Sequence, residues 1–556
     1  MFRTMAALSL LALAGAALAQ DKPAAAEPAT AVNARLAAPL PANQAAMKAH
    51  VLFLADDALK GREAGTPEFD IAAAYVAAQF YAAGLRPAGD DGGYRQRVPL
   101  VSYRSASKGD MVWSPRRGAA PAPLAFGEDY VPAANPGQAE TSVSAPVVFV
   151  GYGIVAPQYR ENGYAGVDVR GKIVAVIGGA PARFGGEERA FFGSPGTKAT
   201  IARDHGAVGI VNLPSVRSRA QPFARMVETY DNPRVTWAKP DGTGNAVAPE
   251  TPVLATLSDP GAARLFAAAR TPWPKIAAEA QKDDARFKAE VLPGTLSVAT
   301  RTGFTPLSSS NVAGLIPGAD PVLGKEVVVL SAHLDHIGIS KTGTGDRINN
   351  GALDNAIGIA SLIEEAKRFA ASGQPPKRSI LFLAVTGEEK GLVGSDYFVN
   401  HPLMPLSSIV ADVNLDMPIL TYKFEDMIVY GAERSTLGPI VRRAIGTIGV
   451  GLSADPMPEQ GIFVRSDHFR FVQKGIPSVF LWPGPKGAGK AATDFFMANN
   501  YHKPSDDLSQ AILWDQGIRF VDANYRIARE IADGPGRPVW NKGDYFGTLY
   551  KGPMAR

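Results

Sequence analysis

After residue 308, short apolar runs alternate with amphipathic stretches, and this alternation limits the folds that the chain can adopt. Four runs, at 326–330, 378–385, 408–414 and 476–481, are rich in Val, Ile and Leu, which is typical of buried strands in a mostly parallel sheet. Residues 359–370 carry apolar side chains at helical spacing, with charged residues on the opposite face. Strands that alternate with helices predict an α/β fold, a mostly parallel mixed sheet flanked by helices on both faces.

Acidic or imidazole side chains occur near the ends of these predicted strands and at the start of the predicted helix. Open α/β sheets place their ligands outside the carboxyl ends of the strands, so side chains that follow several strands gather in one crevice. We therefore expect a common site from the side chains His333, Asp354, Glu388, Glu389, Asp416 and His502.

Each of these residues also has an ordinary structural explanation. Asp354 precedes a predicted helix, where an Asp is commonly an N-cap. Glu388 and Glu389 are compatible with a solvated loop pair, and His502 with a surface histidine. For all of these residues together, the ordinary structural explanations are less convincing, because several unpaired carboxylates in one crevice repel one another. A pair of divalent cations between them removes that repulsion.

The residue types restrict the metal. The sequence has no cysteine and seven histidines, so imidazoles and carboxylates must hold any ion. Two His, two Asp and one Glu suit Zn²⁺ and also accept Mn²⁺ or Co²⁺. Two such ions need a bridging carboxylate, and a neighbouring free carboxylate would serve as general base. The adjacent Glu388 and Glu389 can supply one ligand and one base, and Asp335 is positioned to accept the second N–H of His333.

Six motifs occur in an order and spacing that resemble a known family. They lie at 332–336, 351–355, 386–389, 414–417, 466–468 and 501–502. The chain resembles the secreted co-catalytic, two-zinc aminopeptidases, whose relatives include plasma glutamate carboxypeptidase, glutaminyl cyclase and the non-enzymatic transferrin receptor. The resemblance extends over nearly all of the mature chain except a linker and the tail after about Gly534.

The resemblance implies a role for each ligand residue. His333 and Asp416 would hold one zinc ion, and Glu389 and His502 the other. Asp354 would bridge both ions. Glu388 would be the general base that activates water between them.

For the surrounding residues the resemblance implies supporting roles. Asp335 would orient His333, and His336 would be structural or support the ligands. Asp467, His468 and Tyr501 would support the ligands or line the substrate side of the crevice. One departure is Pro418, which follows the motif at 414–417 where relatives commonly have Ile-Gly.

The chain divides into several predicted segments. A start that contains Arg3, an apolar run to Leu18 and an A-x-A end indicate a secretory signal peptide at 1–19. An Ala- and Pro-rich flexible linker would follow at 20–44. Catalytic segments at 45–135 and 300–535, the latter with the metal site, would flank an α+β insertion at 136–299 that resembles a protease-associated domain; residues 536–556 would form a C-terminal tail.

The resemblance implies a metallo-exopeptidase, and the predicted signal peptide indicates that it is exported, periplasmic or extracellular, with no transmembrane segment after signal cleavage. The formal net charge of +4 gives no argument for nucleic acid as a partner. Of the possible activities we favour that of an aminopeptidase, which acts on peptides with a free N-terminus. A carboxypeptidase or dipeptidase on the same metal core, and a non-catalytic binding protein of the receptor type, stay open, as does the oligomeric state.

Overall fold

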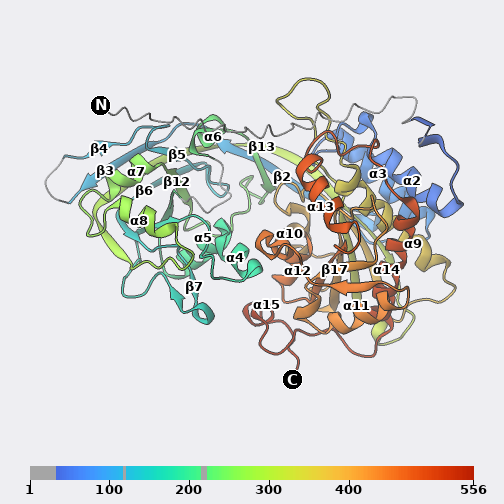
Figure 1. The fold of residues 1–556 in the computed structure, drawn as a ribbon. Coiled ribbons are helices and arrows are strands. Elements are labelled where there is room, and N and C mark those ends of the chain that lie inside the picture. Colours follow the sequence, from blue (N-terminus) through green and yellow to red (C-terminus); the bar gives the residue numbers. More distant parts are fainter. Residues whose placement is uncertain (1–32, 35, 117–119, 215–221) are drawn as a thin grey trace, which may run out of the picture. The chain divides into compact units, whose positions relative to one another are not determined.

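A computed structural model of the chain describes residues 33–34, 36–116, 120–214 and 222–556. The predicted signal peptide and most of the predicted linker lie outside the described residues. Residues 40–556 form one unit of the chain, and their elements are labelled in Figure 1. The first labelled helix, α2 (Ala42–Leu54), begins two residues before the predicted end of the linker at residue 44.

The centre of the catalytic part is a run of four parallel strands. Strand β14 pairs in parallel with both β15 and β16, and β16 pairs in parallel with β19. Every residue of the four strands is buried, as expected for strands covered on both faces. The four predicted strands are confirmed at β14 (Val327–His333), β15 (Ser379–Val385), β16 (Ile409–Leu415) and β19 (Ser478–Pro483).

Antiparallel strands extend this sheet on both sides. Strand β13 pairs with β15 and with β2 on one side, and β17 pairs with β19 on the other. The sheet is therefore mixed and mostly parallel at its centre, which confirms the predicted fold class. The added strands are β1 (Arg86–Pro87), β2 (Arg95–Ser105), β13 (Glu290–Ile316), β17 (Asp426–Tyr430) and β18 (Gly451–Ser453), of which β18 pairs in parallel with β17.

Helices cover both faces because successive side chains of a strand point in opposite directions. In β14, Val328 and Leu330 belong to the core that contains the side chains of α9 and α14. Val327 and Val329 belong to a separate core with Phe398 and Phe471 from α10 and α12. The helices of this part are α2, α3 (Pro67–Ala82), α9 (Ile357–Ala371), α10 (Val393–Asn400), α11 (Leu437–Gly446), α12 (His468–Val472), α13 (Gly489–Asn499) and α14 (Trp514–Asp533).

The insertion has its own sheet, which shares the long strand β13 with the catalytic sheet. Residues 290–301 of β13 pair with β3 and β6, whereas residues 302–316 pair with β2 and β15. Strands β3 and β5 also belong to this sheet, so its strands begin before the predicted boundary at Pro136. The strands are β3 (Asp110–Pro115), β4 (Ala122–Pro123), β5 (Tyr130–Pro132), β6 (Glu140–Phe149), β9 (Ile173–Ile177), β10 (Gly209–Leu213) and β12 (Val253–Leu257).

The remaining elements of the insertion are short. Strand β11 (Arg234–Trp237) pairs with β2 rather than with the insertion's sheet, and β7 (Val155–Ala156) and β8 (Glu161–Asn162) form a separate hairpin. The helices are α4 (Gly186–Gly193), α5 (Pro195–Asp204), α6 (Phe223–Glu228), α7 (Asp259–Leu265) and α8 (Trp273–Ala280).

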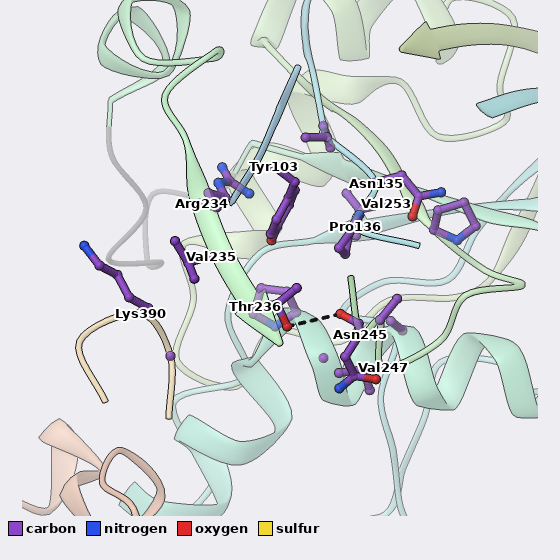
Figure 2. Close-up of a pocket in the computed structure, with 18 of the residues that line it drawn as sticks. Tyr103, Asn135, Pro136, Arg234, Val235, Thr236, Asn245, Val247, Val253 and Lys390 are labelled. Carbon is purple, nitrogen blue, oxygen red and sulfur yellow. Dashed lines mark hydrogen bonds between the residues drawn. The ribbon is translucent and has the colours of Figure 1, made fainter. Parts of the chain in front are cut away.

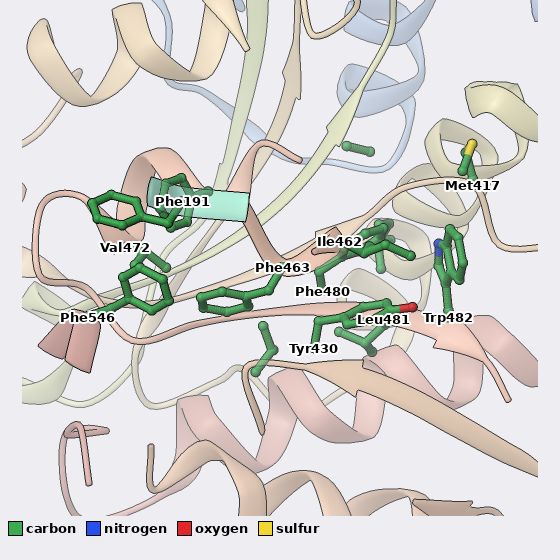
Figure 3. Packing of buried hydrophobic residues seen from close by; sticks show 14 of the residues in the cluster. Phe191, Met417, Tyr430, Ile462, Phe463, Val472, Phe480, Leu481, Trp482 and Phe546 are labelled. Carbon is green, nitrogen blue, oxygen red and sulfur yellow. The ribbon is translucent and has the colours of Figure 1, made fainter. Parts of the chain in front are cut away.

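The C-terminal residues pack against the catalytic part rather than extending away from it. Trp540 is fully buried, and its indole N–H donates to the carbonyl of Gly475 at 2.8 Å. Phe546, in α15 (Tyr545–Leu549), contacts Phe463 in the aromatic cluster that Figure 3 shows beside β19. Among the described residues, none of the helices combines the length and the hydropathy needed to cross a membrane.

Candidate metal centre

His333 occupies the last position of β14, and its imidazole faces two carboxylates. Its Nε2 lies 3.1 Å from Oδ1 of Asp416 and 3.3 Å from Oδ1 of Asp354. Nδ1 lies 3.0 Å from the backbone carbonyl of Asp335. If Nδ1 carries the proton and donates it to that carbonyl, Nε2 is left with a lone pair aimed between the two carboxylates.

The other oxygen of Asp354 faces a second set of residues. Oδ2 lies 3.3 Å from Nε2 of His502, and the same nitrogen lies 3.1 Å from Oε2 of Glu389. Asp354 therefore stands between two pairs, each made of one imidazole and one carboxylate. This is the bridging position that the sequence resemblance implied for Asp354.

The spacing of these atoms fits zinc. Two donors on a tetrahedral Zn²⁺, with bonds of 2.0–2.1 Å, lie about 3.3 Å apart. The four imidazole–carboxylate distances, 3.1 to 3.3 Å, agree with that value. His333, Asp354 and Asp416 also offer ligand atoms that lie within 4.8 Å of one another, and all three residues are buried.

Asp506 and Arg62 fix the backbone that carries Asp354. The residue lies in an irregular turn, Ala352–Ala356, that precedes α9. The carboxylate of Asp506 accepts hydrogen bonds from the backbone N–H groups of Leu353 and Asp354, both at 2.9 Å. The sequence analysis did not identify Asp506, although it follows His502 by only four residues.

The guanidinium of Arg62 is fully buried beneath the site. It donates to the carbonyls of Leu54, Leu334 and Gly351 at 2.7 to 2.9 Å, so it ties together the turns that follow His333 and precede Asp354. Burial lowers the pKa of Arg62 to about 10, even though nearby carboxylates, Asp354 foremost, favour its charged form. Arg62 is thus a buried cation beside an acidic site, and the sequence analysis did not identify it.

The structure corrects the predicted role of Asp335. The imidazole of His333 contacts the backbone carbonyl of this residue, not its carboxylate. The carboxylate instead accepts the backbone N–H of Glu388 at 3.1 Å. Asp335 therefore positions the loop that carries Glu388 as well as the ring of His333.

Asp467 and His468 are not among the residues that line the cavity beside the ligands, so of their two predicted roles the supporting one stays a prediction. Both residues are fully buried. Asp467 accepts a hydrogen bond from Ser395 at 2.5 Å, and His468 packs its ring against Phe463 and Phe480. Ser466 is the functional neighbour from this motif, because its hydroxyl donates to Oδ2 of Asp416 at 2.6 Å.

A cavity of about 60 Å³ opens beside the carboxylates of Asp354 and Asp416. Glu388 lines it together with Asp354 and Asp416, and Tyr501 is also part of the lining. Burial raises the pKa of the Glu388 carboxyl well above its usual value, with Asp416 and Glu389 adding repulsion. The rest of the lining is Met417, Ile462, Arg465, Ser466, Phe480, Trp482, Met497 and His502.

A larger cavity, of about 790 Å³, lies away from these residues. Figure 2 shows it beside β11, with Arg234, Thr236 and Asn245 on its wall and Thr236 donating to the carbonyl of Asn245. None of the predicted catalytic or metal-binding residues lines it. Of these two cavities, the smaller one therefore has the reactive side chains in its wall.

Charge pairing sets the ionisation of the site without metal. Burial favours the neutral form of Asp354, but His336, His333 and His502 outweigh it and hold the pKa of this carboxyl well below its usual value. Burial likewise opposes the charge on His502, yet hydrogen bonds to Asp354 and Glu389 raise its pKa to about 10. The pKa of Glu389 falls to about 2, against burial and the repulsion of Asp354, through its contacts with His336 and His502.

Zinc binding to the metal-free protein is expected to release protons at pH 7.5. His502 holds its proton below about pH 10, and a zinc-bound imidazole must give it up. The apparent zinc affinity should therefore rise with pH between about 6 and 9. Titration calorimetry in buffers of different ionisation enthalpy measures the release, and His502→Gln should lower it by about one proton. Equal release by both proteins would contradict the role of His502.

Part of the chain is similar to a known peptidase family and to several known proteins. Residues 311–527 match Peptidase family M28. The chain is 30% identical to leupeptin-inactivating enzyme 1 of Streptomyces exfoliatus over 191 residues, which are 34% of this chain and 39% of that protein. It is also 30% identical to a probable leucine aminopeptidase 2 of Aspergillus oryzae over 219 residues, 36% of this chain and 40% of that protein. The chain thus spans about two fifths of the length of these relatives.

Among solved structures, an aminopeptidase from Aneurinibacillus sp. strain AM-1 aligns with a TM-score of 0.48 and 19% identity. The alignment covers 89% of this chain and 95% of that one.

Proposed function

We propose that the protein, whose residues 311–527 match Peptidase family M28, is a two-zinc aminopeptidase, which removes N-terminal residues from peptides. The observation that carries this proposal is the position of Asp354, whose two oxygens each lie 3.3 Å from a different histidine. A carboxylate in that position is what two ions in one site require.

The residues around Asp354 divide between the two ions. His333 and Asp416 would hold one, Glu389 and His502 the other, and Asp354 both. When bound, the ions supply Lewis-acid chemistry, which polarises the scissile carbonyl and makes water acidic enough to lose a proton near neutral pH.

Glu388 is the proton carrier of the proposed reaction. Its carboxyl lines the cavity beside Asp354 and Asp416. In the first step Glu388 takes the proton of the attacking water, and in the second it gives that proton to the nitrogen of the leaving amine. The backbone N–H of Glu388 donates a hydrogen bond to the carboxylate of Asp335, and this bond holds the loop in place during both proton transfers.

The cavity supports an exopeptidase over an endopeptidase. Its volume of about 60 Å³ suits a single side chain rather than an extended peptide. The apolar part of the lining, such as Met417 and Trp482, would receive an uncharged side chain. The neighbouring carboxylates would attract the α-ammonium group of the same residue.

A substrate panel tests this assignment. Aminoacyl anilides with a free amine, the same compounds after N-acetylation, and peptides blocked at the C-terminus are incubated with zinc-loaded protein. We expect hydrolysis of free-amine substrates, including C-blocked peptides, and a loss of hydrolysis on acetylation. Hydrolysis that needs a free C-terminus instead would favour a carboxypeptidase, and zinc-loaded protein inert toward the whole panel would favour a binding protein.

Export is a separate part of the proposal. The apolar segment that ends in Ala17-Leu18-Ala19 supports cleavage after Ala19 and a periplasmic or extracellular mature protein. Mass spectrometry of the protein from cell fractions should find Gln20 as the N-terminal residue outside the cytoplasm. An intact N-terminus in the cytoplasmic fraction would contradict it.

A further inference from the structure

His336 lies inside the candidate metal centre, with Nδ1 of its ring beside two carboxylates. Its side chain is completely buried, and neither Nδ1 nor Nε2 has a hydrogen-bond partner among the described residues. A buried polar atom in a native protein is nearly always satisfied. Nε2 of His336 therefore lacks the partner that a buried nitrogen normally has among the described residues, and Nδ1 has the carboxylates of the centre beside it.

The surroundings of Nδ1 indicate what that partner is. Nδ1 lies only 2.7 Å from Oε1 of Glu389 and 3.9 Å from Oδ2 of Asp354, yet Oε1 of Glu389 also lacks a hydrogen-bond partner. Nδ1 of His336 thus faces the carboxylates of two residues of the candidate metal centre. His336, Asp354 and Glu389 offer ligand atoms that all lie within 4.8 Å of one another.

We propose that His336 is a direct ligand of the zinc ion at Glu389, in addition to His502. This inference rests on the proposed two-zinc function and adds one protein ligand to the zinc coordination given there. The ion would have four protein donors, His336, Asp354, Glu389 and His502, and the ion at His333 would have three. A site with four protein donors is closed, whereas three leave a position open for water or substrate.

The two histidines of this ion differ in their surroundings. His336 is fully buried, whereas the side chain of His502 is 36% exposed and its backbone has a φ of 57°. The buried set of His336, Asp354 and Glu389 forms the fixed base of the site, and His502 closes it from the solvent side. The ion at Glu389 should accordingly leave the protein more slowly than the ion at His333.

X-ray absorption spectroscopy of the zinc-loaded full-length protein tests the proposal. With His336 as a ligand, His333, His336 and His502 give three imidazoles over two ions; without it there are two. His336→Phe keeps a ring against Gly351, whose backbone the histidine ring closely approaches, and removes both nitrogens. We expect this variant to lose one imidazole from the spectrum and to bind one of its two ions about 100-fold more weakly or worse.

The matched control is His401→Phe, because His401 is an exposed histidine whose ring stacks on Tyr397. It should leave the spectrum and both affinities unchanged. Two imidazoles over two ions in the unaltered protein would overturn the proposal, and that result needs no variant to fold. If the unaltered protein binds a single ion, the two-zinc function fails, and His336 is judged separately by whether His336→Phe removes an imidazole from that ion. Unaltered protein that binds no zinc would overturn both.

Discussion

Replacing Glu388 with glutamine is expected to lower kcat by about 10²- to 10⁴-fold, the range typical of a lost general acid–base group. The amide has nearly the same shape but cannot take a proton from water. Glu388 contributes to neither of the buried groups that could hold a metal among the described residues, so the zinc content should stay at two ions per chain. Steady-state rates on a free-amine aminoacyl anilide, with metal analysis of the same sample, measure both quantities.

Glu365→Gln is the matched control for this substitution. Glu365 lies buried in α9, and its carboxyl oxygens have no hydrogen-bond partner among the described residues. Burial raises the pKa of this carboxyl well above its usual value, so glutamine replaces a group already inclined to be neutral. Activity should stay at the unaltered level. A Glu388→Gln protein with more than a tenth of normal activity would exclude Glu388 as the base, and one that has lost zinc would make it a ligand.

Asp354→Asn is expected to have the second large effect, the loss of both ions together with activity. The carboxylate places one oxygen beside His333 and the other beside His502. An asparagine offers a single oxygen and turns an N–H₂ group toward one of the two ions, so it cannot bridge. We expect zinc affinity at both positions to fall by about 100-fold or more, and hydrolysis to become undetectable at stoichiometric zinc.

Asp416→Asn gives the comparison that makes this result specific. Asp416 forms a close imidazole–carboxylate pair with His333. Among the described residues, it forms no such pair with the residues of the other ion, His502 and Glu389. It should therefore weaken one ion and spare the other, which zinc competition with a chromogenic chelator resolves as two affinities. Unchanged binding of two ions by Asp354→Asn would contradict the bridge, and so would identical losses in the two variants.

The parts that the sequence predicts well depend on local pattern. Two continuous runs of apolar, β-branched residues end at His333 and at Asp416. Each run could therefore be identified directly as a strand, and the polar residue at its end as a candidate site residue. Parallel pairing then brings the two ends together without further information. The position of Asp354 near both histidines agrees with the role that the sequence resemblance implied.

The parts that the sequence missed depend on where a side chain or a turn points. His336 is three residues from His333 and was predicted to have a supporting role, because nothing in the spacing shows that the turn aims its ring at Glu389. The use of a carbonyl rather than a carboxylate at Asp335 is likewise a matter of rotamer. Arg62 and Asp506 act on the backbone around Asp354 from distant segments, and such contacts leave no periodic signal in the sequence.

Diffraction at the zinc absorption edge, from crystals of the unaltered protein grown with zinc, tests the central claim most directly. The account predicts two anomalous peaks, one beside His333 and Asp416 and one beside Glu389 and His502, with an oxygen of Asp354 bound at each. A single peak, or two peaks of which Asp354 touches only one, would contradict it.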